Sequence, residues 1–367
     1  MNSVNSVKPL KSVKPLSVAL VVTNLAGGGA ERALLRLAAA LMKRGHSVRM
    51  ILLEDRIEHE LPPGLRIDVL RTHGGTLGKW HATMALRWLR LPPDALTVST
   101  LPFADEVAIR AGLPNLWCRI ANTLSEEIAR LKGRKAARRL ARYRRMYEGR
   151  RLIAVSDGVA ADLRSGIGLA HARIERIYNG FDFEAIRSAA QAAEPDLPRE
   201  PFVLHVGRFM PQKRHDLLLD AYRRSGLEQP LVLLTQPSPA LEELIAAAGL
   251  QGRVQLAGFR PNPYPWMRAA ELLVLSSERE GLPGVLVEAL ACGTRVVSTD
   301  CPSGPREVLR GGLARWLVPN GDAQALADTM RAALAAPRPD AVALPAEFSE
   351  AHMVERYEAL ATVATAR

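Results

Sequence analysis

Cysteine is scarce in this chain, which has three in 367 residues. Cys118, Cys292 and Cys301 are too far apart and odd in number for a disulfide framework, and they form no metal-ligand spacing. Long apolar runs are also absent, because no stretch reaches the roughly 20 residues that span a bilayer. Aromatic residues make up 5% of the chain and are not interleaved with basic ones as in nucleic-acid-binding surfaces. We therefore expect a protein of the reducing cytosol with no nucleic-acid partner.

Acidic residues are fewer than basic ones, and the net charge is +11. By charge alone this predicts an anionic partner, whether nucleic acid, phospholipid or a phosphorylated substrate. The content of 48% apolar and 24% charged residues is typical of a globular protein. A chain of this length fits two domains of about 150 to 200 residues each.

The N-terminus resembles a secretory signal peptide, because three lysines precede an apolar run at residues 16–26. Thr23 and Asn24 interrupt that run, and the glycines at 27–29 and a long amphipathic stretch follow it. We interpret the run instead as the first strand and loop of a fold. Residues 1–16, with a repeated Ser-Val-Lys-Pro-Leu, are then a disordered leader.

Strand-like apolar runs alternate with amphipathic helical stretches along the first half of the chain. The runs are Ser17–Val22, Ser47–Leu53, Leu96–Thr100, Leu116–Ile120, Leu152–Val155 and Ile174–Tyr178. This alternation predicts βαβ units and a mostly parallel sheet. We assign residues 17–190 to a first domain and residues 191–200, rich in Pro, Glu and Asp, to a linker.

The same alternation restarts after the linker. Its runs are Phe202–Val206, Leu231–Leu234, Val254–Leu256, Leu272–Leu275, Arg295–Ser298 and Trp316–Val318. They predict a second domain, residues 201–348, followed by a helix, residues 349–367, that packs back on the first domain. The expected fold class is α/β, with two facing, doubly wound, Rossmann-like domains and a central cleft for a ligand.

Two carboxylates, Glu280 and Glu288, stand where the run Leu272–Leu275 leads through a Gly/Pro loop into a helix. Pro283 suits the first turn of that helix. In open α/β sheets ligands bind at the carboxyl ends of strands, and a helix N-terminus offers free N–H groups to an anion. The two carboxylates are therefore predicted to hold hydroxyls of a phosphorylated ligand.

Basic residues follow another strand end. Gly207 and Arg208 come directly after the run that ends at Val206, and Lys213 precedes the next helix. Cations at that position would stabilise a phosphate leaving group without a metal. A solvated basic loop is the alternative interpretation.

In order and spacing, these elements resemble the retaining glycosyltransferases of family 4, which have the GT-B fold. The matching elements are Gly27-Gly-Gly-Ala-Glu-Arg, Ala154-Val-Ser-Asp-Gly-Val, Ile177-Tyr-Asn-Gly, Gly207-Arg with Gln212-Lys, Gly258-Phe, Glu280 with Glu288, and Asp300-Cys-Pro-Ser-Gly-Pro-Arg-Glu. They run nearly from end to end of the chain. The first glycine loop lacks the Gly-x-Gly-x-x-Gly spacing of a dinucleotide site, which counts against a dehydrogenase.

The resemblance implies an enzyme that uses a nucleotide sugar as substrate and needs neither a cofactor nor a metal. At the catalytic centre it implies that Arg208 and Lys213 bind the diphosphate and that Glu280 contacts the transferred sugar. Glu288 would hold the ribose hydroxyls. The other donor contacts that it implies are at Gly28, Gly29, Gly207, Phe259, Gly281, Leu282, Pro283, Gly284 and Val285.

Two segments depart from the family pattern. Members often carry a His near the reacting sugar where this chain has Ala121 and Asn122, so no His role carries over. Arg119 and Asn122 become candidates for sugar or acceptor contacts, with a structural role as the alternative. The Gly-x-Gly common after the second strand of the donor domain is replaced by a segment starting at Thr235, which puts one backbone phosphate contact in doubt.

Residues 131–152 hold ten Lys or Arg against one Glu. Arg134, Arg138, Arg142 and Arg145 are predicted to share one stripe of a basic amphipathic helix, which is typical of membrane-surface or anion binding. Each cation near an anionic leaflet is worth about 1 kcal/mol. We predict reversible binding to an anionic membrane or to a lipid diphosphate, with a solvated helix face as the alternative.

These features predict a retaining, metal-independent glycosyltransferase that moves a hexose or N-acetylhexosamine from a UDP-sugar to a membrane-associated, polyprenyl-diphosphate-linked glycan. We expect it to be cytoplasmic, at the inner face of the cytoplasmic membrane. One alternative is a lipopolysaccharide-core or exopolysaccharide enzyme that uses GDP-mannose or UDP-glucose. Another is a non-catalytic protein that binds membranes or nucleic acid on the same scaffold.

Overall fold

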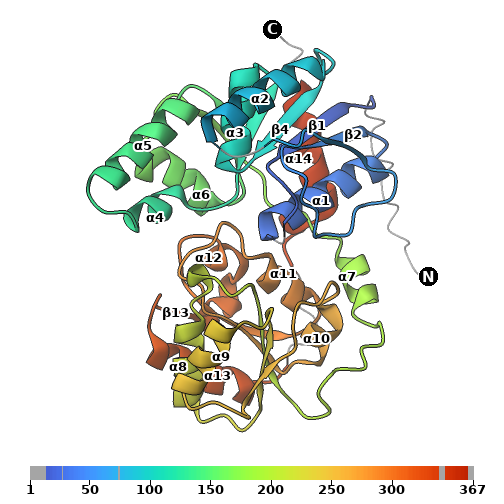
Figure 1. Ribbon diagram of the computed structural model, residues 1–367. Helices are drawn as coiled ribbons and strands as arrows, with labels where there is room; N and C mark the ends of the chain where they lie inside the picture. Colours follow the sequence, from blue (N-terminus) through green and yellow to red (C-terminus); the bar gives the residue numbers. More distant parts are fainter. Residues whose placement is uncertain (1–13, 27, 73–74, 339–343, 363–367) are drawn as a thin grey trace, which may run out of the picture.

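Two parallel β-sheets, each flanked by helices, make up the computed structural model (Figure 1), which describes residues 14–26, 28–72, 75–338 and 344–362. The first sheet contains β1 (Ser17–Val22), β2 (Ser47–Leu52), β3 (Arg66–Val69), β4 (Leu96–Thr100), β5 (Leu116–Ile120), β6 (Arg151–Ala154) and β7 (Arg173–Arg176). The second contains β8 (Val203–Val206), β9 (Leu231–Leu234), β10 (Val254–Leu256), β11 (Leu272–Leu275), β12 (Arg295–Thr299) and β13 (Leu317–Val318).

Helices connect the strands in both domains. The first domain has α1 (Gly29–Lys43), α2 (Gly75–Trp88), α3 (Pro102–Ala111), α4 (Leu124–Ala129), α5 (Arg134–Tyr147) and α6 (Asp157–Ala161) with the π turn η1 (Asp162–Gly166). Helix α7 (Phe183–Ala189) follows these in the chain and packs on the second domain. The remainder has η2 (Pro211–Lys213), α8 (His215–Ser225), α9 (Pro239–Ala247), α10 (Tyr264–Ala269), α11 (Gly284–Ala291), α12 (Pro305–Val308), η3 (Gly311–Trp316), α13 (Ala323–Ala335), η4 (Ala346–Phe348) and α14 (Glu350–Thr362).

The strand order places one topological switch point in each sheet. The orders are β3-β2-β1-β4-β5-β6-β7 and β10-β9-β8-β11-β12-β13, so the winding reverses between β1 and β4 and between β8 and β11. Ligands of doubly wound folds bind outside the carboxyl ends of the strands at such points. The fold therefore marks the ends of β1 and β4, and of β8 and β11, as candidate ligand sites.

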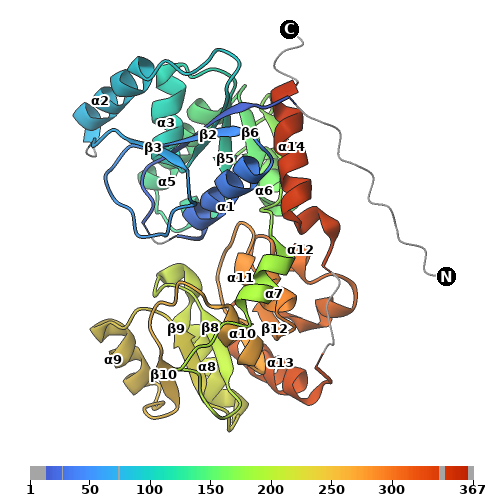
Figure 2. The ribbon, with the colours of Figure 1, turned by 90° about the vertical axis from the view of Figure 1, so that its right-hand side faces the viewer.

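The first sheet is covered on both faces because successive side chains of a strand point to opposite sides. In β1, Leu20 and Val22 pack with α1 and α14, whereas Ala19 and Val21 pack with α2 and α3. Figure 2 shows the two layers, with α1 and α14 on one side of the sheet and α2, α3 and α5 on the other. A strand buried on both faces reads as a continuous apolar run, as β1 does.

The last helix lies on the first domain although it follows the second in sequence. Tyr357 and Leu360 of α14 are buried in the core that β1 and α1 form. Glu358 accepts a hydrogen bond from Arg44 Nε at 3.2 Å and lies 2.9 Å from His46 Nε2. None of the helices in the described residues is long and apolar enough to cross a bilayer.

Every strand predicted from the sequence is present, with its ends shifted by at most two residues. Only β3, among the described strands, was not predicted. Its residues Arg66–Val69 alternate charged and apolar side chains, lie at the sheet edge and are nowhere fully buried. Such a short edge strand gives no apolar run to detect.

The buried carboxyl of Asp105 makes the stability of the first domain depend on pH. It accepts hydrogen bonds from Ser99 Oγ at 2.6 Å and Tyr147 Oη at 2.7 Å, and burial raises its pKa from 3.8 to about 7. The protonated form is favoured in the folded state, so its contribution is complete below about pH 4 and is lost as the pH rises to about 7.

We expect the unfolding free energy to fall across this window by at most about 1.4 kcal/mol per pH unit through Asp105. Asp105→Asn should remove that part of the slope, because the amide does not titrate. Urea unfolding followed by circular dichroism at several pH values measures it. Equal slopes in both proteins would contradict the assignment.

Candidate functional site

The loops after β8 and β11 meet at the switch point of the second sheet. Gln212 Nε2 donates to the carbonyl of Arg279 at 2.7 Å, and Ser276 Oγ donates to the carbonyl of Lys213 at 2.8 Å. These bonds bring the ammonium of Lys213 within 2.7 Å of Glu280 Oε1. Glu280 is buried. Two residues predicted separately therefore form one ion pair at the expected ligand site.

Arg208 follows the end of β8 by two residues, and its charge acts on residues of the first domain. It is exposed and makes no hydrogen bond or ion pair with any residue that the structure describes. Its charge helps to lower the pKa of His59, after burial and the charge of Arg32, and opposes the rise that burial causes in the pKa of Glu31. Both affected residues belong to the first domain, so Arg208 is a free cation facing it.

Glu288 on α11 is bound by the opposite domain. Its Oε1 accepts a hydrogen bond from Arg36 of α1, which also donates to Tyr264 Oη at 3.2 Å and stacks on Phe181 at 5.0 Å. Its Oε2 has no hydrogen-bond partner among the described residues. The sequence did not indicate Arg36, because the pair spans 252 positions.

The loop from Gly281 to Val285 carries the predicted backbone contacts. Gly281, Leu282 and Pro283 are buried, whereas Gly284 and Val285 begin α11 and are partly exposed. A Cβ at Gly281 would lie 2.0 Å from the carbonyl oxygen of Ala121. Glycine is required there because the first domain touches the loop backbone.

The other predicted donor contacts are distributed around this loop. Gly207 lies against Lys213, since a Cβ there would be 3.6 Å from Cδ. Phe259 is 55% exposed and so is not a core residue. In the first domain Gly28 precedes α1 and Gly29 begins it, whereas Gly27 lies outside the described residues.

Glu31 is a cleft residue that was not predicted. Its carboxylate folds back on the start of α1, since a Cβ at Gly28 would lie 1.9 Å from Oε2. Burial raises its pKa, and a hydrogen bond from its own backbone and the charges of Arg208 and Arg119 oppose the rise. The segment from Gly28 to Glu31 therefore brings a carboxylate near cations from both domains, Arg119 and Arg208.

The two candidates at the end of β5 are held by protein groups. Arg119 is 3% exposed and donates from Nη2 to Asn179 Oδ1 at 2.5 Å. Asn122 Oδ1 accepts the backbone N–H of Thr123 at 2.9 Å. Thr123 Oγ1 in turn donates to the carbonyl of Glu280 at 2.9 Å. The segment that lacks the family His thus supports the loop that begins at Glu280, while contacts to sugar or acceptor remain predictions.

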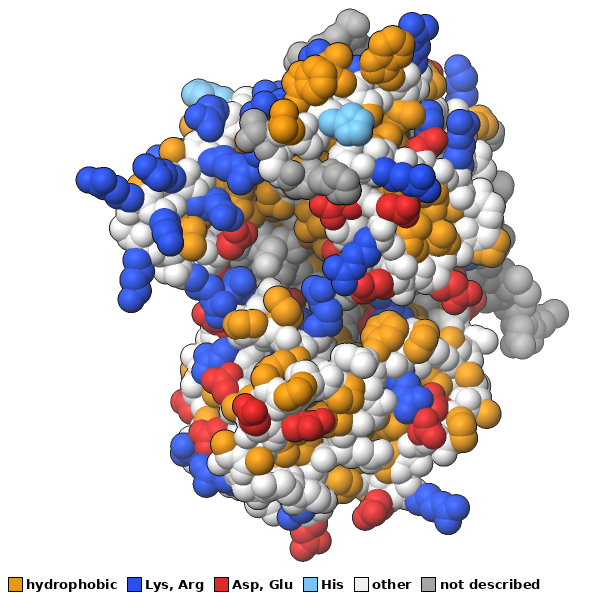
Figure 3. Space-filling model, in the orientation of Figure 1, with side chains coloured by type: hydrophobic (Ala, Val, Ile, Leu, Met, Phe, Trp, Pro, Cys, Tyr) orange, Lys and Arg blue, Asp and Glu red, His pale blue; other side chains and the backbone are white. Residues whose placement is uncertain are grey.

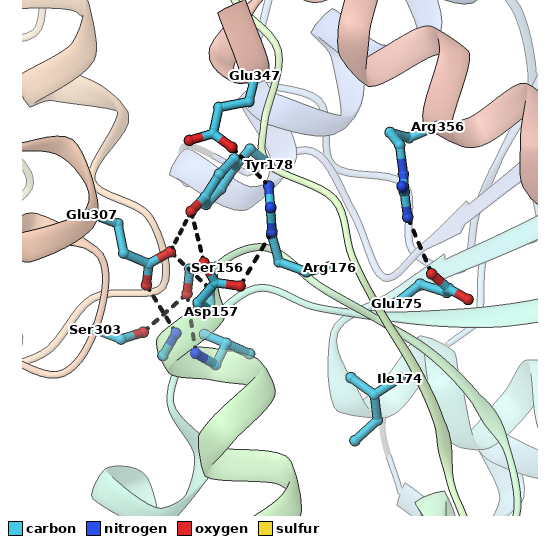
Figure 4. A network of polar contacts seen from close by, with 12 residues as sticks. Ser156, Asp157, Ile174, Glu175, Arg176, Tyr178, Ser303, Glu307, Glu347 and Arg356 are labelled. Carbon is cyan, nitrogen blue, oxygen red and sulfur yellow. Dashed lines mark hydrogen bonds and ion pairs between the residues drawn. The ribbon is translucent and has the colours of Figure 1, made fainter. Parts of the chain in front are cut away.

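Glu307, in the Asp300–Glu307 motif, joins the domains (Figure 4). Its carboxylate accepts the backbone N–H groups of Asp157 at 2.7 Å and Gly158 at 2.8 Å, at the start of α6. Tyr178 Oη donates to it at 2.8 Å. The sequence singled out all three motifs involved but did not show that they meet. In this structure these contacts hold the two domains together.

The basic helix is present as α5, but its cations are not equivalent. Arg142 is half-buried and pairs with Glu106 of α3 at 2.6 Å, so it is not available as the predicted stripe requires. Arg134, Arg138 and Arg145 are exposed, without partners in the described part of the chain. Within those ranges, no three His, Cys, Asp or Glu side chains gather as a metal site would need.

The two facing sheets and the switch-point site define a glycosyltransferase of the GT-B fold. The structure superposes on the pneumococcal O-GlcNAc transferase GtfA, solved with UDP and GlcNAc, with a TM-score of 0.73. The sequences are 12% identical, and the match covers 96% of this chain and 100% of that one. This likeness concerns the fold, which is the one predicted.

The chain belongs to glycosyltransferase family 4, because the models Glycosyltransferase Family 4, residues 27–185, and Glycosyl transferases group 1, residues 200–336, match it domain by domain. It is similar to N-acetylgalactosamine-N,N'-diacetylbacillosaminyl-diphospho-undecaprenol 4-alpha-N-acetylgalactosaminyltransferase of Campylobacter jejuni, with 29% identity over 79% of this chain and 82% of the relative. Lipopolysaccharide core biosynthesis glycosyltransferase LpsE of Rhizobium meliloti is 28% identical over 82% and 84%. The chain is an enzyme, so the non-catalytic alternative is wrong.

Arg36 is expected to position Glu288 for the donor. Arg36→Ala leaves a buried carboxylate without its charged partner, which costs about 1.5 to 3 kcal/mol. We therefore expect the KM for the nucleotide sugar to rise at least about tenfold, with a smaller change in kcat. Arg32→Ala, one turn earlier and without a bond to Glu288, is the control. Equal KM values in wild type and Arg36→Ala would refute the role.

Proposed function

We propose that this enzyme transfers a hexose or N-acetylhexosamine from a UDP-sugar to a polyprenyl-diphosphate-linked glycan, with retention of configuration and without a metal. The observation that carries the proposal is the ion pair of Lys213 with Glu280 at the switch point between β8 and β11, with the exposed Arg208 two residues after the end of β8. Two cations there match the charge of a nucleotide diphosphate. A carboxylate beside them matches the hydroxyls of the attached sugar.

In the reaction that we propose, the bond between the sugar C1 and the diphosphate oxygen breaks as the acceptor oxygen bonds to C1 on the same face. The acceptor's proton passes to the departing diphosphate. Arg208 and Lys213 stabilise the negative charge that develops there, the role that a metal ion plays in other transferases. Glu280 positions the sugar, beside Lys213, and is not assigned as a covalent nucleophile, because same-face attack by the acceptor needs no covalent intermediate.

Support for the donor and acceptor comes from the similar proteins. The fold neighbour GtfA was solved with UDP and GlcNAc, and the Campylobacter relative is named for a diphospho-undecaprenol acceptor. The free cations of α5 suit an anionic membrane or the diphosphate of such a lipid. We accordingly propose that the enzyme works in the cytoplasm at the inner face of the cytoplasmic membrane.

Donor choice is tested by thermal shift with UDP-, GDP- and ADP-sugars, with the largest rise in Tm expected for UDP-sugars. Mass spectrometry of a polyprenyl-diphosphate glycan should then show one added sugar, and NMR should show an anomeric configuration equal to that of the donor. Transfer should persist in EDTA. An inverted product or loss of activity in EDTA would overturn the corresponding part of the proposal.

A second candidate is a lipopolysaccharide-core transferase that uses GDP-mannose or UDP-glucose. The similarity to LpsE favours it. In the same donor screen a GDP-mannose preference would exclude the UDP-sugar assignment, whereas a UDP-glucose preference fits both candidates, so that the acceptor then decides. Transfer to a delipidated core oligosaccharide but not to a polyprenyl-diphosphate glycan would favour this second candidate.

A further inference from the structure

Helix α2 exposes an apolar side that the fold leaves uncovered. Leu77 is 85% exposed, Trp80 67% and Trp88 73%. At 3.6 residues per turn the three fall within an arc of roughly 80°. On the opposite side, Ala82 and Leu86 are buried against β1 and α3. The helix therefore has one apolar side for the core and a second that faces solvent.

The exposure of two tryptophans on this helix is unusual within the chain. Of the five tryptophans, Trp117 and Trp266 are fully buried and Trp316 is partly buried. A cluster of exposed Trp and Leu marks an interaction site rather than ordinary surface. Tryptophan is enriched where an apolar phase meets water, because its ring is apolar while its N–H still needs a polar partner.

The cationic helix α5 lies in the same layer as α2 and α3, on one face of the first sheet (Figure 2). Glu106 of α3 joins α2 to α5 by accepting hydrogen bonds from Lys79 at 2.9 Å and Arg142 at 2.6 Å. The cations on α5 or just before it that make no side-chain hydrogen bond or ion pair with a described residue are Lys132, Arg134, Lys135, Arg138 and Arg145. Figure 3 shows apolar side chains gathered over α2 and Lys and Arg side chains over α5, above the recess between the domains.

We infer that α2 inserts its exposed apolar side into the interface of an anionic membrane while α5 binds the lipid headgroups. This extends the proposed membrane association, for which α5 was the surface named above. Apolar insertion and electrostatic attraction add, and two such signals are needed for stable peripheral binding. The aromatic and the cationic residues occupy separate helices. Such a surface fits a bilayer, in which the apolar interface and the headgroups lie at different depths. A nucleic acid would instead need aromatic side chains interleaved with the cations, so that bases could stack on them.

Charge also argues against a second copy of this chain as the occupant. A two-fold contact through α2 would bring the same cationic helix of both copies to one interface. Five unpaired cations on each side would repel each other. An anionic leaflet has the complementary charge and no such repulsion.

Flotation of the full chain with vesicles tests the inference. Phosphatidylcholine vesicles with phosphatidylglycerol should carry the wild type, and Trp80→Ser with Trp88→Ser should lower the bound fraction at least about tenfold. Met210→Ser, which removes an exposed apolar side chain of the other domain, should bind like the wild type. Tryptophan fluorescence of the wild type should shift to the blue on binding, and the double variant should lose that shift.

Two results would overturn the inference. One is unchanged flotation of the double variant. The other is a wild-type dimer in light scattering that the double variant abolishes, which would make α2 a contact between copies. Hydrolysis of the nucleotide sugar without lipid should be equal in wild type and double variant. Slower hydrolysis by the double variant would indicate misfolding. In that case the flotation of Leu77→Ser alone decides whether α2 inserts into the membrane. Absence of hydrolysis in the wild type would count against the proposed function instead.

Discussion

Lys213→Ala is expected to lower the rate of sugar transfer by about 10²- to 10³-fold, the usual cost of removing one group that stabilises charge in a transition state. Its ammonium lies 2.7 Å from Glu280 Oε1 at the strand switch point. The loss removes a cation from the departing diphosphate and also frees the carboxylate that orients the sugar. Initial rates with saturating donor and acceptor measure the effect on kcat.

Arg223→Ala provides the control for Lys213→Ala. Arg223 lies on α8 of the same domain and forms an exposed ion pair with Asp220, so its removal changes the net charge equally while leaving the switch point intact. Transfer at the wild-type rate is expected. If Lys213→Ala keeps full activity with an unchanged fold, the diphosphate is bound elsewhere.

Gly281→Ala is expected to reduce transfer at least about 100-fold, because a misplacement of about 1 Å near reacting groups costs that much. The added Cβ would lie 2.0 Å from the carbonyl of Ala121. The clash is between the backbone segments at Gly281 and Ala121, so no flexible side chain can move aside. The two domains must therefore separate. The loop from Gly281 to Val285 then loses its contact with the first domain.

The separation of the domains can be measured apart from activity. Small-angle X-ray scattering should give a larger radius of gyration for Gly281→Ala than for wild type. Gly312→Ala, at a position where a Cβ meets nothing within 4 Å, should match the wild type in scattering and in rate. A fully active Gly281→Ala enzyme would show that the closed contact is dispensable.

Much of the fold was predictable because the strands are buried on both faces. Runs such as Leu231–Leu234 and Leu272–Leu275 are fully buried, and continuous burial requires continuous apolar sequence. The edge strand β3 was missed for the opposite reason. Its side chains Arg66 and Asp68 are polar, so they carry no apolar signal.

The site was predictable only where one loop holds its residues. Glu280 and Glu288 share a segment with a strand end and a helix start, and Arg208 and Lys213 share another. Arg36 could not be found in this way, because its partner lies on the other domain and only the folded chain brings them together. Glu307 is similar: a carboxylate that caps a helix 149 positions away leaves no local pattern.

Helix α14 has a consequence for the order in which the chain is made. During synthesis domains usually fold from the N-terminus as they leave the ribosome. Here Met353, Tyr357 and Leu360 fill the core of the first domain, yet they are translated after the whole of the second. Until the second domain has been translated, the first domain lacks α14. Its apolar surface beside α1 is therefore exposed. Translation speed and chaperones that cover such surfaces should therefore govern the yield of this enzyme.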